Sequence, residues 1–258
     1  MLSQTKIQHS FQRALASYND HAIVQKKSAL TLLSHLVKCD IKPKLTRVFE
    51  FGCGTGFLTL PLTQRFTISE LIANDIVEEC HNYLSRSDLK FIIGDIDKIA
   101  IPSNCDLICS ASYAQWSTDL EGLIERITAS LNEDGYMAIS SFSEGQFKEL
   151  TLLEEQAGLE PTASLNYWPE QTWKEHLKSD YEVEIITKEQ TCLWFDSVRE
   201  LLLHLRLTGV NGNAGQTWNK RSLSEFETNY RDNFEVNGKV PLSYEPIYII
   251  ARKRALRS

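Results

Sequence analysis

The chain has 258 residues, with 27 Lys and Arg against 34 Asp and Glu, so its formal net charge is −7 at pH 7. A hydrophobic share of 42% and a charged share of 24% are those of an ordinary globular protein, which excludes a disordered, collagen-like or coiled-coil chain. The acidic balance disfavours a broad nucleic-acid-binding face, and no apolar run approaches the roughly 20 residues that span a bilayer. The N-terminal segment lacks the apolar core of a signal peptide, which favours the cytoplasm.

Six cysteines are scattered along the chain, without a C-x-x-C pair and without a tight cluster of cysteines and histidines. A zinc site needs closely placed ligands, and a disulfide framework is typical of small secreted chains. We therefore expect no disulfide framework and no metal site.

The first 40 residues precede the first predicted strand and carry apolar residues at helical spacing. Two helices are predicted, over 5–17 and 22–38, with the polar segment SYNDH between them. Because both helices come before the sheet, they form an appendage to it. We expect residues 1–40 to act as a helical lid.

Short apolar runs rich in β-forming residues then alternate with longer helical stretches. The runs are 46–51, 70–75, 89–94, 105–110 and 136–142. Such alternation is typical of a parallel sheet that helices cover on both faces. The sequence predicts an α/β fold with a Rossmann-like, doubly wound, mostly parallel sheet.

Three capping boxes mark expected helix starts. They are Thr118-x-x-Glu121, Ser143-x-x-Gln146 and Ser197-x-x-Glu200. The first of these helices is expected to end at Asp134-Gly135, and the third near Gly209.

Two regions, 160–180 and 196–235, interrupt the regular pattern. We predict helical insertions there, on the substrate side of the sheet. Extended runs over 182–194 and 244–252 flank the second region. Since no stretch rich in Pro, Gly and Ser divides the chain, residues 1–258 are predicted to form a single domain.

The strongest motif is Glu50-Phe51-Gly52-Cys53-Gly54-Thr55-Gly56, directly after a predicted strand and before a helix. Closely spaced glycines let the backbone approach a ligand without an intervening Cβ, and the next helix offers free N–H groups. A dinucleotide-binding loop has the pattern G-x-G-x-x-G, whereas here the third glycine comes one position early. The form E-x-G-x-G-x-G resembles the first motif of Rossmann-like S-adenosylmethionine methyltransferases. Taken alone, such a loop can also be a simple tight turn.

Acidic residues close the second and third predicted strands. At Asp75, a carboxylate can accept hydrogen bonds from both hydroxyls of a ribose. Resemblance to the same methyltransferase superfamily places Asp95 on the adenine amino group and Ile96 against the adenine ring. Acids at strand ends are also common turn residues. The glycine loop, Asp75 and Asp95 follow three successive predicted strands. Together they favour a ligand site at the carboxyl edge of the sheet.

Motifs elsewhere in the chain narrow the resemblance. The patterns are Phe11-x-Arg13-Ala14-x-x-Ser17-Tyr18-x-x-His21-Ala22-x-x-Gln25, Ser110-x-x-x-x-Gln115-Trp116, Phe195-x-Ser197-x-Arg199-Glu200-Leu201-Leu202-x-His204-Leu205-x-x-Thr208-Gly209-Val210-Asn211 and Pro241-Leu242-Ser243-Tyr244-Glu245. They are similar to those of the malonyl-acyl-carrier-protein O-methyltransferases of biotin synthesis. The similarity extends over almost the whole chain.

This resemblance implies methyl transfer from S-adenosylmethionine to the free carboxylate of a malonyl thioester on acyl carrier protein. The carboxylate is ionised at neutral pH, so no general base is needed. Catalysis then depends on holding the oxygen and the methyl carbon about 3–3.5 Å apart and on excluding water. The expected cofactor is S-adenosylmethionine and the expected partner is malonyl-acyl-carrier protein, with no nucleic acid and no membrane.

The resemblance also assigns residues to the cofactor. They are Gln25, Glu50, Gly52, Gly54, Gly56, Asp75, Asp95, Ile96 and Ser110. Gln25 would hold the methionine carboxylate of the cofactor, with a solvated surface glutamine as the alternative.

Four further residues are candidates for catalysis and substrate binding. Tyr18, between the two N-terminal helices, is the candidate lid residue, and a tyrosine that packs the helix against the sheet is the alternative. Arg199 could grip the malonyl carboxylate with two parallel hydrogen bonds, or be a solvated helix arginine. Tyr113 and Trp116 follow the fourth strand, where an acyl substrate would pass, although Trp116 also suits a core position.

Acyl carrier proteins are acidic, so docking on this acidic chain requires a local basic patch. The candidate residues are Lys174, Lys178, Arg199, Arg206, Lys220 and Arg221. Two other functions stay open at this point. One is a methyltransferase that acts on a free small carboxylic acid or a quinone-like ring. The other is a catalytically silent S-adenosylmethionine-binding subunit.

Overall fold

The computed structural model describes residues 4–84, 88–156, 165–210 and 220–255. The chain forms two compact units, each assembled from three separate stretches. The sheet unit comprises Ile23–Glu144, Asn166–Glu189 and Pro246–Ser258, and the helix-rich unit comprises Met1–Ala22, Gly145–Leu165 and Gln190–Glu245. The stretches of the two units alternate along the chain, so each unit is built from segments that are far apart in the sequence.

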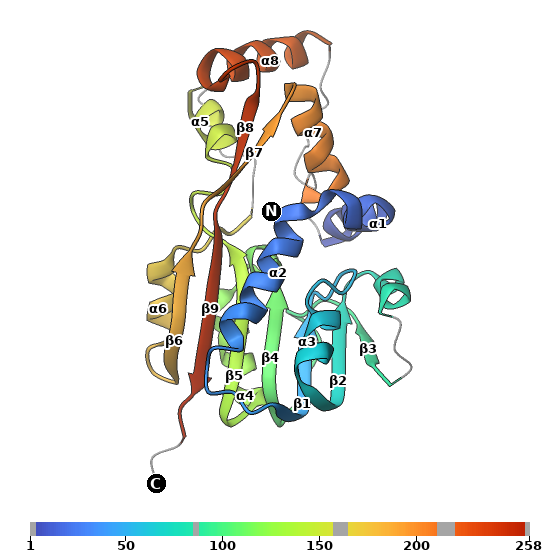
Figure 1. The fold of residues 1–258 in the computed structure, drawn as a ribbon, viewed down its shortest axis with the longest axis vertical. Helices are drawn as coiled ribbons and strands as arrows, with labels where there is room; N and C mark the ends of the chain where they lie inside the picture. The colour runs from blue at the N-terminus through green and yellow to red at the C-terminus, as the bar shows by residue number, and fades with distance from the viewer. Residues whose placement is uncertain (1–3, 85–87, 157–164, 211–219, 256–258) are drawn as a thin grey trace. The chain divides into compact units, whose positions relative to one another are not determined.

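A seven-stranded sheet forms the centre of the sheet unit, in the order β3-β2-β1-β4-β5-β9-β6 (Figure 1). Its strands are β1 (Lys44–Phe51), β2 (Thr67–Asp75), β3 (Lys90–Ile93), β4 (Cys105–Ala111), β5 (Leu131–Phe142), β6 (Tyr181–Lys188) and β9 (Pro246–Lys253). Neighbours among β1 to β5 are parallel, whereas β9 is antiparallel to both β5 and β6. The predicted mostly parallel sheet is thereby confirmed. Its order reverses between β1 and β4, where open α/β sheets bind ligands outside the carboxyl ends of the strands.

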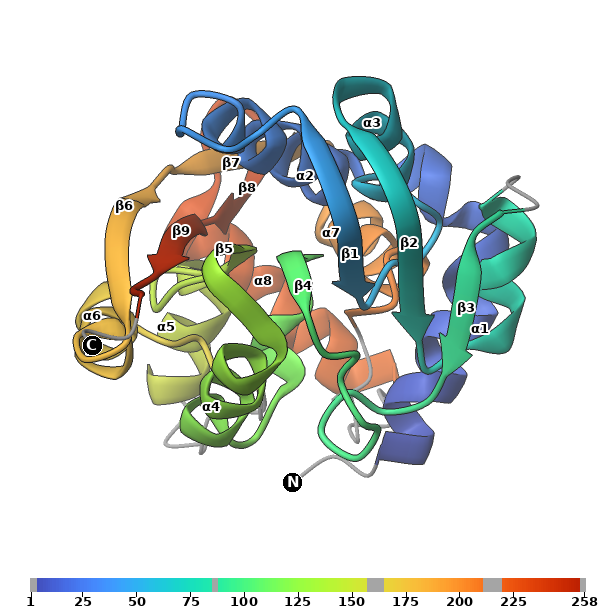
Figure 2. The same cartoon turned by 90° about the horizontal axis from the view of Figure 1, so that it is seen from below.

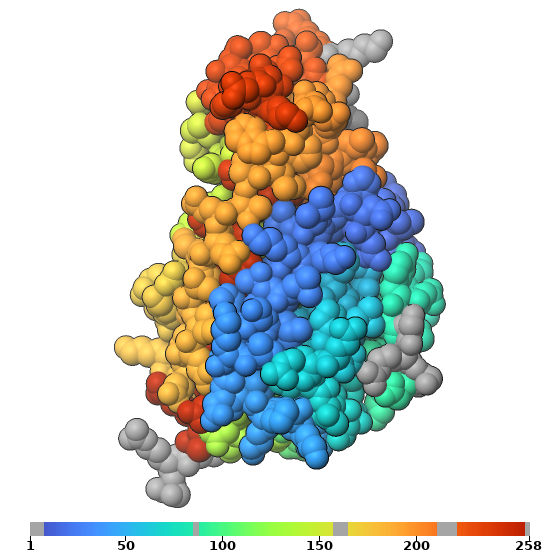
Figure 3. All heavy atoms as spheres, viewed as in Figure 1, coloured from blue at the N-terminus to red at the C-terminus, as the bar shows by residue number. Residues whose placement is uncertain are grey.

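Helices cover both faces of this sheet. α2 (Ile23–Leu36) and α3 (Thr59–Arg65) lie on one face, and α4 (Leu120–Ser130) and α6 (Glu170–Leu177) lie on the other (Figure 2). The atoms of α2 and α3 form the outer surface of their face in the space-filling view (Figure 3). Two short 3₁₀ helices, Glu78–Tyr83 and Ala114–Trp116, follow β2 and β4.

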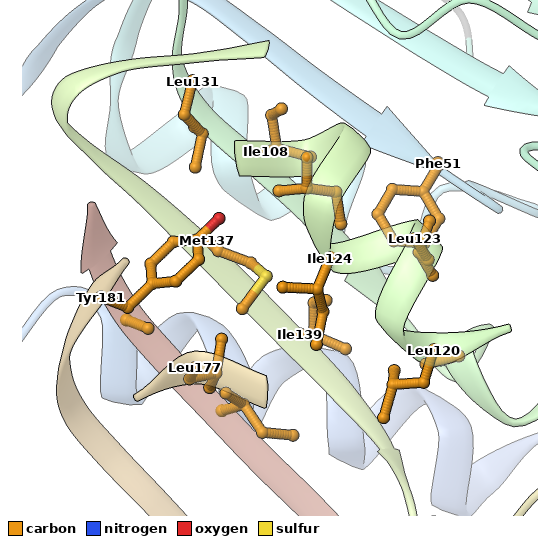
Figure 4. Close-up of a cluster of buried hydrophobic side chains, with 14 of the residues drawn as sticks. Phe51, Ile108, Leu120, Leu123, Ile124, Leu131, Met137, Ile139, Leu177 and Tyr181 are labelled. Carbon is orange, nitrogen blue, oxygen red and sulfur yellow. The ribbon is translucent and has the colours of Figure 1, made fainter. Parts of the chain in front are cut away.

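An apolar cluster fills each side of the sheet. On one side, Leu32 of α2 and Leu62 of α3 are fully buried with their neighbours from β1, β2 and β4. On the other side, Leu123 and Ile124 of α4 and Leu177 of α6 pack over β4 and β5 (Figure 4). This burial on both faces explains why the strands are apolar runs without alternation.

The helix-rich unit contains a two-stranded antiparallel sheet and several helices. Its elements are α1 (Gln4–His21), α5 (Lys148–Gln156), β7 (Thr191–Phe195), α7 (Val198–Leu207), α8 (Lys220–Phe234) and β8 (Val240–Tyr244). α1 packs along the end of α7, where the Ser17 hydroxyl donates to the Leu207 carbonyl at 3.4 Å. A Cβ on Gly209 would lie 2.8 Å from the Phe11 ring, so this helix end needs glycine for close approach as well as for its φ of +73°.

Of the three predicted capping boxes, the structure confirms one and contradicts two. Ser197 caps α7 as predicted, since its hydroxyl accepts from the Glu200 N–H at 3.2 Å. The prediction for Thr118 is wrong, because Asp119 is the cap of α4 and accepts from the Gly122 N–H at 2.9 Å. The Asp119 carboxylate comes one position later in the chain and accepts from the first turn of the helix.

The prediction that Ser143 and Gln146 form a capping box at a helix start is also wrong. α5 begins at Lys148, and the Gln146 amide oxygen accepts from the Glu245 N–H at 2.9 Å instead of serving that helix. The helix after Asp119 ends at Ser130, before Asp134-Gly135, because Leu131 already has the extended backbone of β5.

The two N-terminal helices belong to different units. α1 is part of the helix-rich unit, whereas α2 packs on the central sheet. Their junction at Ala22 and Ile23 is therefore also a boundary between units. Among the helices that the structure describes, none is both long enough and apolar enough to cross a membrane.

Candidate functional site

The glycine loop leaves β1 at Phe51 with three glycines in the left-handed region. Their φ angles are +63° at Gly52, +52° at Gly54 and +88° at Gly56, values that other residues adopt only with strain. The Cys53 N–H donates to the Asn74 carbonyl at 3.0 Å, which ties the loop to the neighbouring strand β2. The predicted strand, glycine loop and helix therefore follow one another as expected.

The first two glycines differ in their surroundings. A Cβ on Gly52 would lie 2.7 Å from the Tyr113 ring, which is closer than real contacts allow. A Cβ on Gly54 would meet no described atom within 4 Å. Gly54 thus exposes its backbone to open space, as a loop that holds a ligand should.

Asp75 is the last residue of β2, and its carboxylate is bonded to this loop. Oδ2 accepts from the Gly54 N–H at 2.9 Å, and Oδ1 accepts from the Val77 N–H at 2.9 Å. Burial raises the pKa of Asp75, while these two backbone bonds and weaker ones from Cys80 and Ile76 act in the opposite direction. The Cys80 thiol and the Ile76 backbone also bond to this carboxylate, so the glycine loop and the turn after β2 hold Asp75 at the end of the strand.

Asp95 and Asp97 lie just beyond β3. The Asp95 carboxylate is buried, accepts from the Asp97 N–H at 3.1 Å and lies 3.4 Å from Lys98 Nζ. Asp97 accepts from the Ser117 hydroxyl at 3.2 Å, and burial together with neighbouring Asp95 raises its pKa. Ile96, between them, is only 1% exposed and belongs to an apolar cluster.

Three predicted cofactor residues have buried polar atoms without a hydrogen-bond partner among the described residues: Gln25 Oε1, Glu50 Oε2 and Ser110 Oγ. Burial raises the pKa of Glu50 to about 8. Such atoms destabilise a fold unless a ligand bonds to them. Gln25 lies next to Lys26, whose ammonium is 5.9 Å from the ring of Phe57 at the end of the glycine loop. A polar ligand with donors of its own therefore fits this edge of the sheet.

Comparison with known proteins agrees with this geometry. A family described as a methyltransferase domain matches residues 49–139. Relatives named malonyl-[acyl-carrier protein] O-methyltransferase include one from Acinetobacter baylyi, 37% identical over 98% of each chain. Another, from Chlorobium phaeovibrioides, is 34% identical over 95% of each chain. The chain belongs to the malonyl-[acyl-carrier protein] O-methyltransferase family. It is a methyltransferase, and S-adenosylmethionine is its methyl donor.

Solved structures share the fold. The N-methyltransferase NodS from Bradyrhizobium japonicum, in complex with S-adenosylhomocysteine, has a TM-score of 0.59 at 13% identity and covers 97% of this chain and 100% of its own. Magnesium protoporphyrin IX methyltransferase from Synechocystis has a TM-score of 0.56 at 14% identity, over 92% of this chain and 86% of its own. The Rossmann-like fold predicted from the sequence is thereby confirmed.

The candidate substrate residues of this methyltransferase are divided between the units. Tyr18 lies in α1 and Arg199 in α7, both in the helix-rich unit, whereas Tyr113 and Trp116 belong to the sheet unit. Tyr18 is half-buried and stands edge-on to the Phe11 ring, with 6.4 Å between centroids.

Arg199 has a carboxylate partner within its own unit. Its side chain is 71% exposed, and Nε donates to Glu227 Oε1 of α8 at 2.5 Å. The guanidinium therefore ties α7 to α8 in this structure. A basic residue in the first turn of a helix opposes the helix dipole, and the Glu227 carboxylate offsets this cost.

The expected basic patch is spread over both units. Lys174 and Lys178 are in the sheet unit, where Lys174 pairs with Glu170 at 2.6 Å. Arg199, Arg206 and Arg221 are in the helix-rich unit, and Arg221 pairs with Glu225 at 2.8 Å. The side chain of Lys220 lies outside the described residues.

Sequence reasoning missed two features of the site. Asp97 is part of the Gly94-Asp95-Ile96-Asp97 segment, which forms a turn after β3, so the alternation of a strand could not have placed its side chain. The position of Tyr113 over Gly52 had no local signal, because it depends on the backbone at Ser112 and on contacts with β5.

Proposed function

We propose that this chain transfers the methyl group of S-adenosylmethionine to the free carboxylate of malonyl-acyl-carrier protein, giving the methyl ester that primes the pimeloyl part of biotin. The similarity over nearly the full length to relatives of that name is the observation that carries the proposal. The ester removes a negative charge. The malonyl group can then enter an apolar fatty-acid synthesis site like an ordinary acyl primer.

The residues at the sheet edge bind and orient. Asp75 accepts the ribose hydroxyls, Asp95 accepts the adenine amino group, and the Gln25 amide holds the methionine carboxylate. When bound, the cofactor supplies an electrophilic methyl group. Because the substrate carboxylate is already ionised, the protein needs no base and acts by alignment and by exclusion of water.

The residues of the helix-rich unit complete the proposal. Residues 1–40 act as the lid, with Tyr18 excluding water, and the insertions 160–180 and 196–235 face the substrate. Arg199 orients the malonyl carboxylate, which requires that it exchange Glu227 for the substrate. Its high exposure supports such an exchange, since an exposed ion pair contributes little stability.

Mass spectrometry of malonyl-acyl-carrier protein after incubation with enzyme and S-adenosylmethionine tests the proposal. We expect the malonyl group to gain the mass of one methylene. Malonyl-coenzyme A and small dicarboxylates serve as competing substrates, and Asp75→Ala protein serves as the control with impaired cofactor binding. Methylation of the small acids in preference to the carrier-bound group would replace this function by a small-molecule one. Cofactor binding without any turnover would indicate a silent subunit.

A further inference from the structure

Ser112 has an unusual backbone conformation. Ser112 follows β4 and has a φ of +61°, a left-handed conformation that is unusual for a residue other than glycine. Its N–H donates to the Ser140 carbonyl at 2.8 Å. Its carbonyl accepts from the Gln115 side-chain amide at 2.7 Å. Strained backbone of this kind persists only where the surroundings hold it, and it is common at ligand sites.

Gln115 is itself firmly held. It is 5% exposed, and its amide oxygen accepts from the Ser141 hydroxyl of β5 at 3.0 Å. Both ends of the amide are therefore bonded, one to β5 and the other to the turn after β4. Gln115 thus connects the central sheet to the conformation of Ser112.

This conformation directs Tyr113 back over the glycine loop. The Tyr113 ring lies 2.7 Å from the place that a Cβ on Gly52 would take, and it stands at 86° to the Phe51 ring with 5.6 Å between centroids. Gly52 therefore has two reasons to be glycine, its φ of +63° and the ring above it. Gly54 has only the first.

The other end of Tyr113 reaches the acidic residues. Its hydroxyl lies among the carboxylates of Asp97, Asp95 and Asp75. Burial, followed by these three negative charges, raises the pKa of Tyr113 above its usual range, so the hydroxyl stays protonated and is available as a donor to a carboxylate. One side chain therefore spans the loop and the acid that we expect to accept the adenine amino group.

We propose that Tyr113 is a cofactor-positioning residue, whose ring sets the backbone at Gly52 and whose hydroxyl orients the Asp95 carboxylate, and that Gln115 holds Tyr113 in place through Ser112. This differs from the substrate contact expected from the sequence. It rests on the cofactor class alone, so its failure and a failure to methylate malonyl-acyl-carrier protein are separate results.

Calorimetry with S-adenosylhomocysteine tests the hydroxyl. A hydrogen bond of this kind contributes about 0.5–1.5 kcal/mol, so Tyr113→Phe should weaken binding by roughly three- to tenfold. The melting temperature of the free protein should fall by only about 2–4 °C. Tyr181→Phe is the matched control, because its hydroxyl bonds to Thr128 at 2.8 Å in the core and its loss should leave the affinity as it is. Wild-type affinity in Tyr113→Phe, whatever its melting temperature, would overturn the proposal.

A double-mutant cycle in the free protein tests the ring. Gly52→Ala should lower the melting temperature more than Gly54→Ala. Adding Tyr113→Ala should recover part of the first loss and none of the second, because only Gly52 lies under the ring. Equal effects of Tyr113→Ala in both backgrounds would show that the ring does not constrain the loop.

The role of Gln115 is tested by combining variants. Gln115→Ala alone should weaken S-adenosylhomocysteine binding about as much as Tyr113→Phe does. In a Tyr113→Phe background it should add little, since both changes act through the Asp95 carboxylate. Fully additive losses would exclude the proposed positioning.

Discussion

The two units differ in whether their buried polar side-chain atoms have hydrogen-bond partners. In the helix-rich unit, the Glu149 carboxylate accepts from the Ser243 N–H at 2.9 Å and from the Ser243 hydroxyl at 2.5 Å. In the sheet unit, Gln25, Glu50 and Ser110 each keep a buried atom without a partner. All such atoms found among the described residues belong to the sheet unit.

This difference in hydrogen bonding has different consequences for ligand binding and for folding stability. A buried polar atom without a hydrogen-bond partner lowers the stability of the fold. A ligand that bonds to this atom removes the penalty, and the gain adds to the free energy of binding. Gln25, Glu50 and Ser110 of the sheet unit, which we propose to contact the cofactor, therefore each have a buried polar atom available to a ligand. The helix-rich unit uses its buried polar groups to hold its own fold. Substitutions in the two units should therefore affect different measurements.

The largest expected effect is on stability in the helix-rich unit. Glu149→Ala removes the acceptor of two hydrogen bonds and leaves the N–H of the partly buried Ser243 unpaired, so the free energy of unfolding should fall by about 2–3 kcal/mol. Urea unfolding measures this. Glu155→Ala, at an exposed position of the same helix, is the control. An equal, small effect of both variants would contradict the role given to Glu149.

Glu50 should make stability depend on pH in the sheet unit. Its pKa is about 8 in the folded protein against an ordinary value of 4.5, so the folded state retains a proton that the unfolded chain releases. Stability from this group is then fully present below about pH 4.5 and is lost as pH rises toward about 8. Each pKa unit corresponds to about 1.4 kcal/mol, so we expect a loss of at least about 2 kcal/mol.

Glu50→Gln removes the titrating group and keeps its shape. Urea midpoints across this pH range should slope downward in the wild type and be flatter in the variant. A wild-type slope that persists in Glu50→Gln would assign the effect to another group.

Asp75→Ala should act on binding. The loss of charge-assisted hydrogen bonds to the ribose should weaken S-adenosylhomocysteine binding tenfold or more, as measured by calorimetry. Asp75→Asn, which keeps one acceptor oxygen, should lose less. Unchanged affinity in Asp75→Ala would reject the ribose assignment.

The smallest expected effect concerns Arg199. Arg199→Lys keeps the charge but loses the two-pronged geometry, so methyl transfer to malonyl-acyl-carrier protein should slow severalfold while cofactor affinity stays constant. Arg206→Lys on the same helix controls for helix stability. If both variants transfer methyl groups like the wild type, Arg199 is only a surface residue.

Glu227→Gln distinguishes two ways in which Arg199 could act. If Arg199 binds substrate, freeing it from Glu227 should not slow the reaction. If it acts only by tying α7 to α8, Glu227→Gln should reproduce the loss seen in Arg199→Lys.

The sequence by itself determined the elements whose causes are local. The glycines at 52, 54 and 56 all have positive backbone φ angles, which the local G-x-G-x-G pattern indicates, and Ser197 caps a helix that starts beside it. The parallel strands could be predicted because burial on both faces needs continuous apolar runs. Asp75 could be located because a strand end is defined by its neighbours in sequence.

Tertiary structure decided what depends on residues far apart in the chain. Gln146 bonds to Glu245 rather than capping a helix, and Arg199 pairs with Glu227, because partners from distant segments compete with local ones. The interleaved units and the position of Tyr113 over Gly52 have the same origin. Such contacts form only when distant segments pack together in the folded chain, so no spacing along the sequence encodes them.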